Sequence, residues 1–420
     1  MSAPLLPRVA PGQLPARRAQ LPSAAVQEEA RRIVEDVRAR GMDAVLEHAR
    51  RLSDLEPGAP ALLDKGALEG ALASLAPSTR ETLARTAARI RAFAEAHRAA
   101  LGDLRVEVPG GAAGVDLRPV VAAGCYAPGG RFPLPSSVLM TAVTARAAGV
   151  EQVVVASPRP SKDTLAAAAL AGADGVLAVG GAQGIAALAF GAGGLPSCDV
   201  IVGPGNAWVT AAKQLLAGEV RIDMLAGPSE LLVIADDDAD PERVAADLLA
   251  QAEHDPEACP MLLALSERFV ARVDDALRAQ LESLPTRAIA AESIARGAAV
   301  VVNDLAAACG VANALAPEHL ALHARDPWAL RPALKHFGAL FLGEGSAEVF
   351  GDYGAGPNHV LPTGGTARAQ GGLSVLDFLR AQMWLDIEPE RAPELVEDAA
   401  ALARVEGLEG HARAALLRTR

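Results

Sequence analysis

The amino-terminal part of the chain carries apolar residues at helical spacing. Residues 24–52 show this spacing, with Gly41 as a break between two helices. A second helical segment covers 78–101, where Ser78 is a plausible cap and Glu81 follows three positions on. The pattern therefore predicts that residues from 24 to about 100 are mostly helical.

From about residue 117, short β-branched runs alternate with alanine-rich helical segments. The runs of the first series are LRPVVAAGCYAP, VEQVVVAS, DGVLAVGG, CDVIVGPG and VRIDMLAG. The runs of the second series are ELLVIADD, MLLALSE, AAVVVND, LALHA and GALFLG. Such alternation is typical of a parallel sheet covered on both faces. We therefore predict an α/β fold with two such units joined near Gly227, followed by a helical tail from about residue 373 that includes SVLDFLRAQMWLDI.

Composition excludes several classes of protein. The chain has 420 residues, 51% of them hydrophobic and 21% charged, which is a globular profile. The net charge of −12 and the lack of a long basic run disfavour nucleic acid and anionic membranes as partners. No apolar run reaches the roughly 18 residues of a membrane span. The four cysteines form no CxxC motif, so we expect reduced, mostly buried thiols in a cytoplasmic protein.

The first 23 residues contain five prolines and no continuous apolar stretch, unlike a secretory signal. We interpret residues 1–23 as an irregular arm that lies on another surface, such as a partner subunit. A disordered tail is the alternative.

Two polar pairs stand at the ends of predicted elements. Gln251 and His254 are three positions apart near the end of an amphipathic helix, so one helical face offers an amide and an imidazole to a metal. A histidine that caps a solvent-facing helix end is the alternative. Glu318 and His319 stand at the start of a short apolar strand, where they suit general acid–base chemistry. Two solvated groups at a strand entrance would look the same, and neighbouring strand residues need not meet.

Two further pairs lie on glycine-rich stretches. Asp352 and His359 belong to the loop GDYGAGPNHVLPTG, which can present side chains from several directions or be a surface turn. Glu406 and His411 flank glycines that can turn the chain toward one site, although a kinked surface helix is equally compatible. Four of the eight histidines thus fall beside a Gln, Glu or Asp. This N/O donor set, without thiolate, favours an open catalytic site for zinc or a similar divalent ion.

Two glycine-rich turns, at 178–184 and 200–208, each follow a predicted strand and open a helix. Such turns bring backbone N–H groups toward a phosphate. Neither matches the dinucleotide motif GxGxxG, so tight strand–helix packing is an alternative.

Ten motifs together resemble the histidinol dehydrogenase family, in the family's order, from about 25 to 415. They are CYAPGG, PSSVLM, GGAQGIAALAFG, IVGPGNAWVTAAK, IDMLAGPSELLVIAD, DLLAQAEHD, APEHLAL, GDYGAGPNHVLPT, LSVLDFL and VEGLEGHA. The resemblance implies a zinc-dependent homodimer of two Rossmann-like parallel-sheet domains, with a helical amino-terminal segment and a small helical carboxy-terminal tail. It also implies oxidation of L-histidinol to L-histidine through L-histidinal with two NAD⁺, in the last steps of histidine biosynthesis.

The resemblance implies domain and residue assignments. Residues 24–125 and 229–372 would form the zinc and substrate domain, 126–228 the NAD domain, and 373–420 a tail that reaches the partner subunit. The zinc ligands would be Gln251, His254, Asp352 and, from the partner subunit, His411. Glu318 and His319 would be the acid–base pair. The substrate would contact His319, the four zinc ligands, Ser229, His359 and Glu406. NAD would contact Tyr126, Gln183 and Asn206.

Rival interpretations share parts of this site. A relative that oxidises another polar alcohol, such as a sulfonated diol, would keep zinc, NAD and the fold, but Glu406 and His359 suit an imidazole-bearing amino alcohol. A zinc hydrolase would use Glu318 as its base, but it would not need the glycine turns beside Tyr126. A binding module would not need the acid–base pair.

Overall fold

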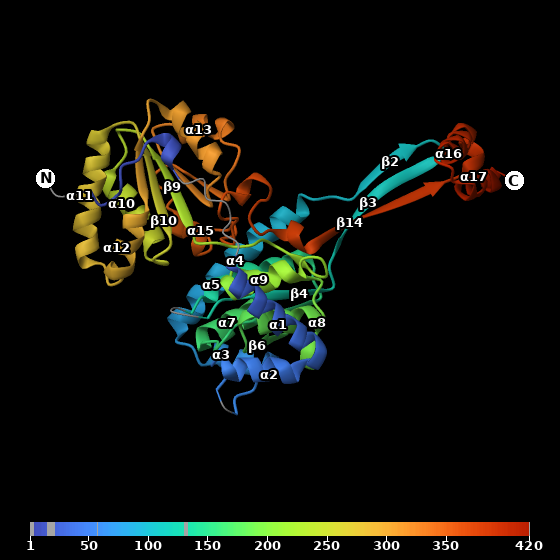
Figure 1. Cartoon of the computed structure of the whole chain (residues 1–420), viewed down its shortest axis with the longest axis horizontal. Helices are drawn as coiled ribbons and strands as arrows, with labels where there is room; N and C mark the ends of the chain where they lie inside the picture. The colour runs from blue at the N-terminus through green and yellow to red at the C-terminus, as the bar shows by residue number, and fades with distance from the viewer. Residues whose placement is uncertain (1–3, 15–21, 57, 130–132, 420) are drawn as a thin grey trace.

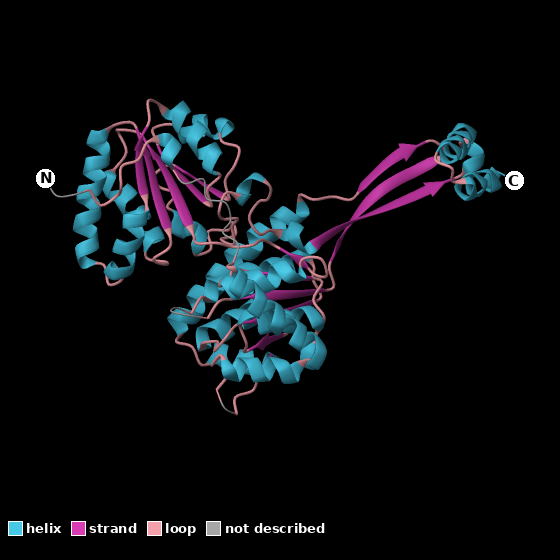
Figure 2. Ribbon diagram, viewed as in Figure 1, coloured by secondary structure: helices cyan, strands magenta, loops and turns pink. Residues whose placement is uncertain are grey.

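The computed structural model describes residues 4–14, 22–56, 58–129 and 133–419, and within them the chain forms three β-sheets (Figure 1, Figure 2). Two sheets are mainly parallel and flanked by helices. The third is a long antiparallel ribbon that projects away from both (Figure 2). The α/β class predicted from the sequence is confirmed.

The first sheet has the strand order β1-β6-β5-β4-β7-β8. Its strands are β1 (Leu62–Asp64), β4 (Ala122–Tyr126), β5 (Gln152–Ala156), β6 (Gly175–Leu177), β7 (Val200–Val202) and β8 (Arg221–Ile222). Neighbouring strands are parallel except β1 and β6. The central β4 and β7 are completely buried, as expected for strands with helices on both faces.

Two groups of helices cover this sheet. One face carries α1 (Ala24–Arg40), α2 (Met42–Arg51), α8 (Gly181–Phe190) and α9 (Ala207–Leu216). The other carries α3 (Lys65–Ala73), α4 (Pro77–Ala99), α5 (Pro135–Val138), a π-helical turn (Leu139–Val143), α6 (Thr144–Ala148) and α7 (Lys162–Ala171). Gly41 separates α1 from α2 as predicted, with φ +59°. The predicted cap Ser78 is wrong, because α4 begins one residue earlier at Pro77, whose fixed φ suits the first helical position.

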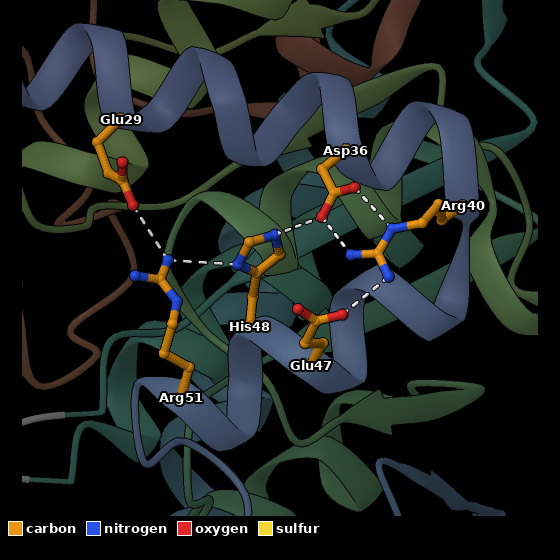
Figure 3. Close-up of polar contacts among 6 residues, drawn as sticks. All are labelled: Glu29, Asp36, Arg40, Glu47, His48 and Arg51. Carbon is orange, nitrogen blue, oxygen red and sulfur yellow. Dashed lines mark hydrogen bonds and ion pairs between the residues drawn. The ribbon is translucent and has the colours of Figure 1, made fainter.

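The helices α1 and α2 are joined by a polar network (Figure 3). Arg51 donates to Nδ1 of His48 over 3.3 Å, and Nε2 of the same ring lies 2.8 Å from Asp36. Because an arginine can only donate, the ring's proton is on Nε2 and is donated to the aspartate. Arg40 bridges Asp36 and Glu47, so the angle between the two helices is held by charged groups as well as by apolar packing.

The second sheet is fully parallel, in the order β11-β10-β9-β12-β13. Its strands are β9 (Glu230–Ala235), β10 (Cys259–Ala264), β11 (Ala298–Val301), β12 (His319–His323) and β13 (Ala339–Leu342). The helices α10 (Pro241–Ala252), α11 (Glu267–Ser283) and α12 (Arg287–Arg296) cover one face, and α13 (Leu305–Leu315) and α14 (Pro327–Leu330) the other. The short α15 (Glu348–Asp352) follows β13.

The predicted grouping of residues 24–125 with 229–372 differs from the packing. The apolar faces of α1–α4 lie against the first sheet, and β4 is an inner strand of that sheet. Residues 24–101 and 120–125 therefore share their hydrophobic core with 126–228, whereas 104–119 belong to the third sheet. The sequence pattern did not show this, because it identifies an apolar face without identifying the sheet that covers it.

Residues 4–14 of the amino-terminal arm lie along the second sheet of their own chain. Leu6 is buried in that core, and the Val9 N–H donates to the carbonyl of Ala299 in β11 over 3.1 Å. Arg8 pairs with the buried Asp274 at 2.6 Å. The prediction for residues 1–3 and 15–21 lies outside the described residues.

The third sheet forms an arm. It consists of β2 (Leu104–Val108), β3 (Gly111–Pro119) and β14 (Leu379–Ile387), with α16 (Pro393–Val405) and α17 (Glu409–Leu416) at its far end (Figure 1). The helix predicted over 374–387 is wrong, because β14 pairs with all nine residues of β3. Apolar residues alternate with polar ones along much of β14, a strand period that the helical interpretation missed. Short 3₁₀ turns occupy Pro11–Gln13, Ala192–Gly194, Arg331–Ala333, Thr366–Arg368, Val375–Phe378, Pro389–Arg391 and Leu417–Thr419.

Candidate active site

A cavity of about 310 Å³ lies where the two parallel-sheet units meet. The first unit contributes Pro128 after β4 and Pro204 and Gly205 after β7. The second contributes polar groups, namely Ser229, His254, Glu318, His319, Asp352 and His359. In parallel α/β folds ligands bind beyond the carboxyl ends of the strands, and the first unit presents that edge to this cavity.

Glu318 and His319 are brought together at the start of β12. One carboxylate oxygen of Glu318 accepts from the Ser229 hydroxyl at 2.6 Å and from the Glu230 N–H at 2.8 Å. The same oxygen lies 3.5 Å from Nδ1 of His319. Neighbouring strand residues would point apart, but Glu318 precedes the first residue of β12 and its side chain turns back.

The His319 ring is oriented by the backbone. Its Nδ1 lies 3.1 Å from the Glu230 carbonyl oxygen, which can only accept, so Nδ1 carries a proton. Its Nε2 is buried and has no hydrogen-bond partner among the described residues. That nitrogen is therefore the one left to act on a bound molecule.

Charges around His319 shift two pKa values. Burial disfavours the charged imidazolium, yet the nearby carboxylates of Glu348, Glu318 and Asp352 outweigh this effect and raise the pKa of His319 to about 10. Burial raises the pKa of Glu348 to about 8, although His319 opposes this shift. Glu348 lies 3.6 Å from Nδ1 of His319 and is 1% exposed. Sequence reasoning missed Glu348, whose only signal is its place one helical turn before Asp352.

The candidate metal ligands Gln251, His254 and Asp352 lie at the carboxyl ends of two helices. Gln251, in the last turn of α10, is fully buried, and neither atom of its amide has a hydrogen-bond partner in the described part of the chain. His254 follows the end of α10, and its Nε2 lies 3.8 Å from an Asp352 oxygen at the end of α15. The residues that the structure describes contain no group of three or more His, Cys, Asp or Glu side chains that could hold a metal.

His359 is placed beside this set by its own loop. Its Nδ1 donates to the Asp352 carbonyl at 3.0 Å, and Nε2 accepts from the Ser137 hydroxyl at 3.4 Å. Burial lowers the pKa of His359, although Asp352 opposes the shift. Both nitrogens of the neutral ring are thus hydrogen-bonded within the chain, and the ring lines the cavity.

Glu406 and His411 are far from the cavity of their own chain. Both are exposed, and they flank the turn between α16 and α17 at the end of the arm (Figure 1). Gly407, with φ +76°, makes this turn. The chain itself does not bring these two residues to the other candidates.

The candidate cofactor residues already make internal hydrogen bonds. The Tyr126 hydroxyl accepts from the Gly181 N–H at 3.2 Å, and Asn206 caps α9. The Gln183 amide is buried and donates to Asp54 at 2.7 Å. Asp54, which no motif indicated, also accepts from Gly180 at 3.1 Å, so it supports the same glycine turn.

A second hollow, of about 940 Å³, is also lined by His319 and Asp352. Its wall includes Phe93, Trp328 and Phe350, which are 48%, 66% and 58% exposed. Large exposed aromatic residues in one hollow are typical of a surface that another chain covers.

Two parallel-sheet units with a polar cavity between them are typical of two-domain α/β enzymes. Residues 16–419 match the family model described as histidinol dehydrogenase. The chain is 46% identical over 394 residues to histidinol dehydrogenase from Thermus thermophilus, covering 94% of each sequence. It is 44% identical over 401 residues to that of Cupriavidus pinatubonensis, covering 93% of this chain and 90% of the relative.

The structural comparison identifies the same family as the sequence comparisons. The crystal structure of histidinol dehydrogenase from Elizabethkingia anophelis has a TM-score of 0.93 at 29% identity, covering 100% of this chain and 99% of that one. The chain belongs to the histidinol dehydrogenase family. It is therefore an oxidoreductase of histidine biosynthesis, as its motifs predicted, and the alternative of another alcohol substrate is not favoured.

Proposed function

We propose that this enzyme oxidises L-histidinol to L-histidine through L-histidinal with zinc and two NAD⁺, as a homodimer with shared active sites. The observation that carries the proposal is the buried amide of Gln251, which lacks a partner and lies one turn from the His254–Asp352 pair. An unpaired buried amide costs stability, so such a group indicates a ligand that satisfies it.

The donor chemistry fits zinc. An amide oxygen, an imidazole and a carboxylate are a mixed N/O set, and His411 of the partner subunit would add a second imidazole. When bound, the ion would anchor nitrogen atoms of the substrate and, by its charge, lower the pKa of the nearby His319.

The two oxidations divide between Glu318 and His319. In the first, Nε2 of His319 takes the hydroxyl proton of the alcohol as the carbon loses hydride, which NAD⁺ accepts. In the second, Glu318 takes a proton from the water that adds to the aldehyde, and a second hydride transfer gives the acid. Each substrate therefore consumes one water and yields two NADH. Ser229, His359 and Glu406 of the partner subunit would hold the substrate while this happens.

NAD⁺ would bind at the glycine turns around Tyr126, Gln183 and Asn206. These residues stand at the carboxyl ends of β4, β6 and β7, which is the ligand edge of a parallel sheet. Because Gln183 is buried against Asp54, contact with the cofactor requires its amide to move from the position described.

The arm supports the shared site. It exposes Met383 (85%), Leu385 (70%) and Val405 (83%), which is unfavourable for an isolated chain. A partner's hollow beside Asp352 would cover such residues and would receive His411.

The proposed location is the cytoplasm, which the buried thiols of Cys125, Cys198 and Cys309, none of them in a disulfide, support. No helix among the described residues has the length and apolar character needed to cross a membrane.

The direct test is NADH formation by the purified, zinc-loaded protein with L-histidinol. We expect two NADH per substrate, loss of activity after chelation, and recovery with zinc. Zinc-restored protein that forms no NADH would refute the proposal.

A further inference from the structure

A buried polar pair lies one helical turn from the proposed zinc ligands and belongs to none of the roles above. Nε2 of His323 is 2.9 Å from a carboxylate oxygen of Asp247, and the two residues are 2% and 8% exposed. Their chain neighbours Leu322 and Leu248 are core residues. Apolar residues in place of such a pair often leave stability unchanged or raise it, so stability alone does not explain it.

The pair joins the two elements that carry the site. On α10, Asp247 precedes Gln251 by four residues, so both lie on one face of the helix. On β12, His319 and His323 are four residues apart and also share a face. The hydrogen bond thus links the carboxyl end of β12 to α10. Gln251 lies four residues after Asp247 on α10, and His319 lies four residues before His323 on β12.

We propose that Asp247 and His323 are a positioning pair that fixes the register of α10 against β12 and so holds Gln251 and His254 at the zinc site. Apolar contacts alone tolerate small shifts of a helix along its axis, whereas a hydrogen bond is restricted to a narrow range of length and angle. The carboxylate only accepts, so Nε2–H donates, and the buried Nδ1 has no partner among the described residues.

This inference rests on the zinc site of the proposed function. The Gln251 amide has no hydrogen bond of its own among the described residues, so the position of α10 sets where it points. His254 immediately follows α10 and would move with it. Groups that orient metal ligands commonly change metal affinity by 10- to 100-fold when removed.

The test measures zinc affinity of the full-length protein by competition with a chromogenic chelator, beside thermal unfolding of the zinc-free protein. D247L and H323L should each weaken zinc binding by about 10-fold or more. The double variant D247L/H323L should be no weaker than either single one, because both remove the same interaction. Its zinc-free thermal midpoint should be unchanged or higher. D247N should stay within about threefold of the unsubstituted protein, because its amide oxygen still accepts from His323.

The control is D274L. Asp274 lies on α11 in the same domain and is the buried ion-pair partner of Arg8, so its loss should leave zinc affinity unchanged. Folded leucine variants with unaltered zinc affinity would overturn the inference. So would failure of the double variant to fold, since the pair would then serve the fold alone. If the unsubstituted protein binds no zinc, the proposed zinc site itself is wrong, which is a separate result.

Discussion

Shared active sites make a quantitative prediction for a mixture of two inactive variants. His254 lies beside Asp352 at the cavity, whereas His411 lies at the end of the arm. If each site takes these two histidines from different chains, H254A and H411A homodimers lack one zinc ligand at both sites. Each variant alone should therefore be nearly inactive.

The recovered activity follows from counting sites. After dissociation and random reassociation of equal amounts, half of the dimers contain one chain of each kind. In such a dimer one site collects both defects and the other collects neither. One site in four is then intact, so activity per subunit should return to roughly a quarter of the unsubstituted value in a C2 dimer.

The assay follows NADH with saturating L-histidinol, NAD⁺ and zinc, after exchange between differently tagged chains has been verified. A mixture of H254A with Q251A is the control. Both residues belong to the part of each site that the same chain supplies, so every site in the mixture keeps one defect and no intact site can form. If exchange is complete but H254A and H411A recover nothing, His411 does not act across the dimer.

Three further variants test the site and the fold. H319A should block oxidation of histidinol, whereas E318A should spare that step and slow oxidation of supplied histidinal; equal loss of both half-reactions would contradict the division of roles. Q251L should stabilise the zinc-free protein by about 1–3 kcal/mol in chemical denaturation, because it removes an unpaired buried amide, while abolishing zinc binding; a less stable zinc-free variant would count against this argument. The hydrogen bond from Arg40 lowers the pKa of Asp36 to about 2, below its unfolded value, so its contribution is present above about pH 4 and lost as the pH falls toward 2. Above about pH 4, D36N should lower the free energy of unfolding by at most about 1 kcal/mol, because the pair is exposed. The corresponding difference in thermal midpoint should shrink as the pH falls toward 2, and a difference that persists undiminished at pH 2 would contradict the argument.

The sequence predicts what depends on local pattern. The break at Gly41, the strands β9–β13 and the position of His319 at a strand entrance all follow from residues close in the chain. The resemblance implied that Gln251, His254 and Asp352 share one site, and the structure places an Asp352 oxygen 3.8 Å from Nε2 of His254. Their role as zinc ligands stays a prediction.

What the sequence did not predict depends on partners distant in the chain. The segment 379–387 becomes a strand because β3, whose paired residues lie 260 or more positions earlier, supplies its hydrogen bonds. Asp54 was missed because it contacts the glycine turn before α8 only through the fold, by hydrogen bonds from Gly180 and Gln183. Tertiary packing likewise decides which core the helices α1–α4 join. Amphipathic periodicity identifies the apolar face of a helix but not the sheet against which it packs.

In the described part of the chain, most of the buried polar atoms without a hydrogen-bond partner belong to candidate site residues and their neighbour Glu348. The described residues contain six buried side-chain atoms without a hydrogen-bond partner, and four of them belong to Gln251, His319 and Glu348. At about 1–3 kcal/mol each, four such atoms cost on the order of 4–12 kcal/mol, comparable with the whole stability of a domain. Such a concentration of buried polar atoms calls for an explanation, and a bound ligand or ordered water is a common one. Binding of a cation and a nitrogen-rich substrate at this one place would therefore raise stability as well as enable catalysis, which couples the folded state to the loaded site.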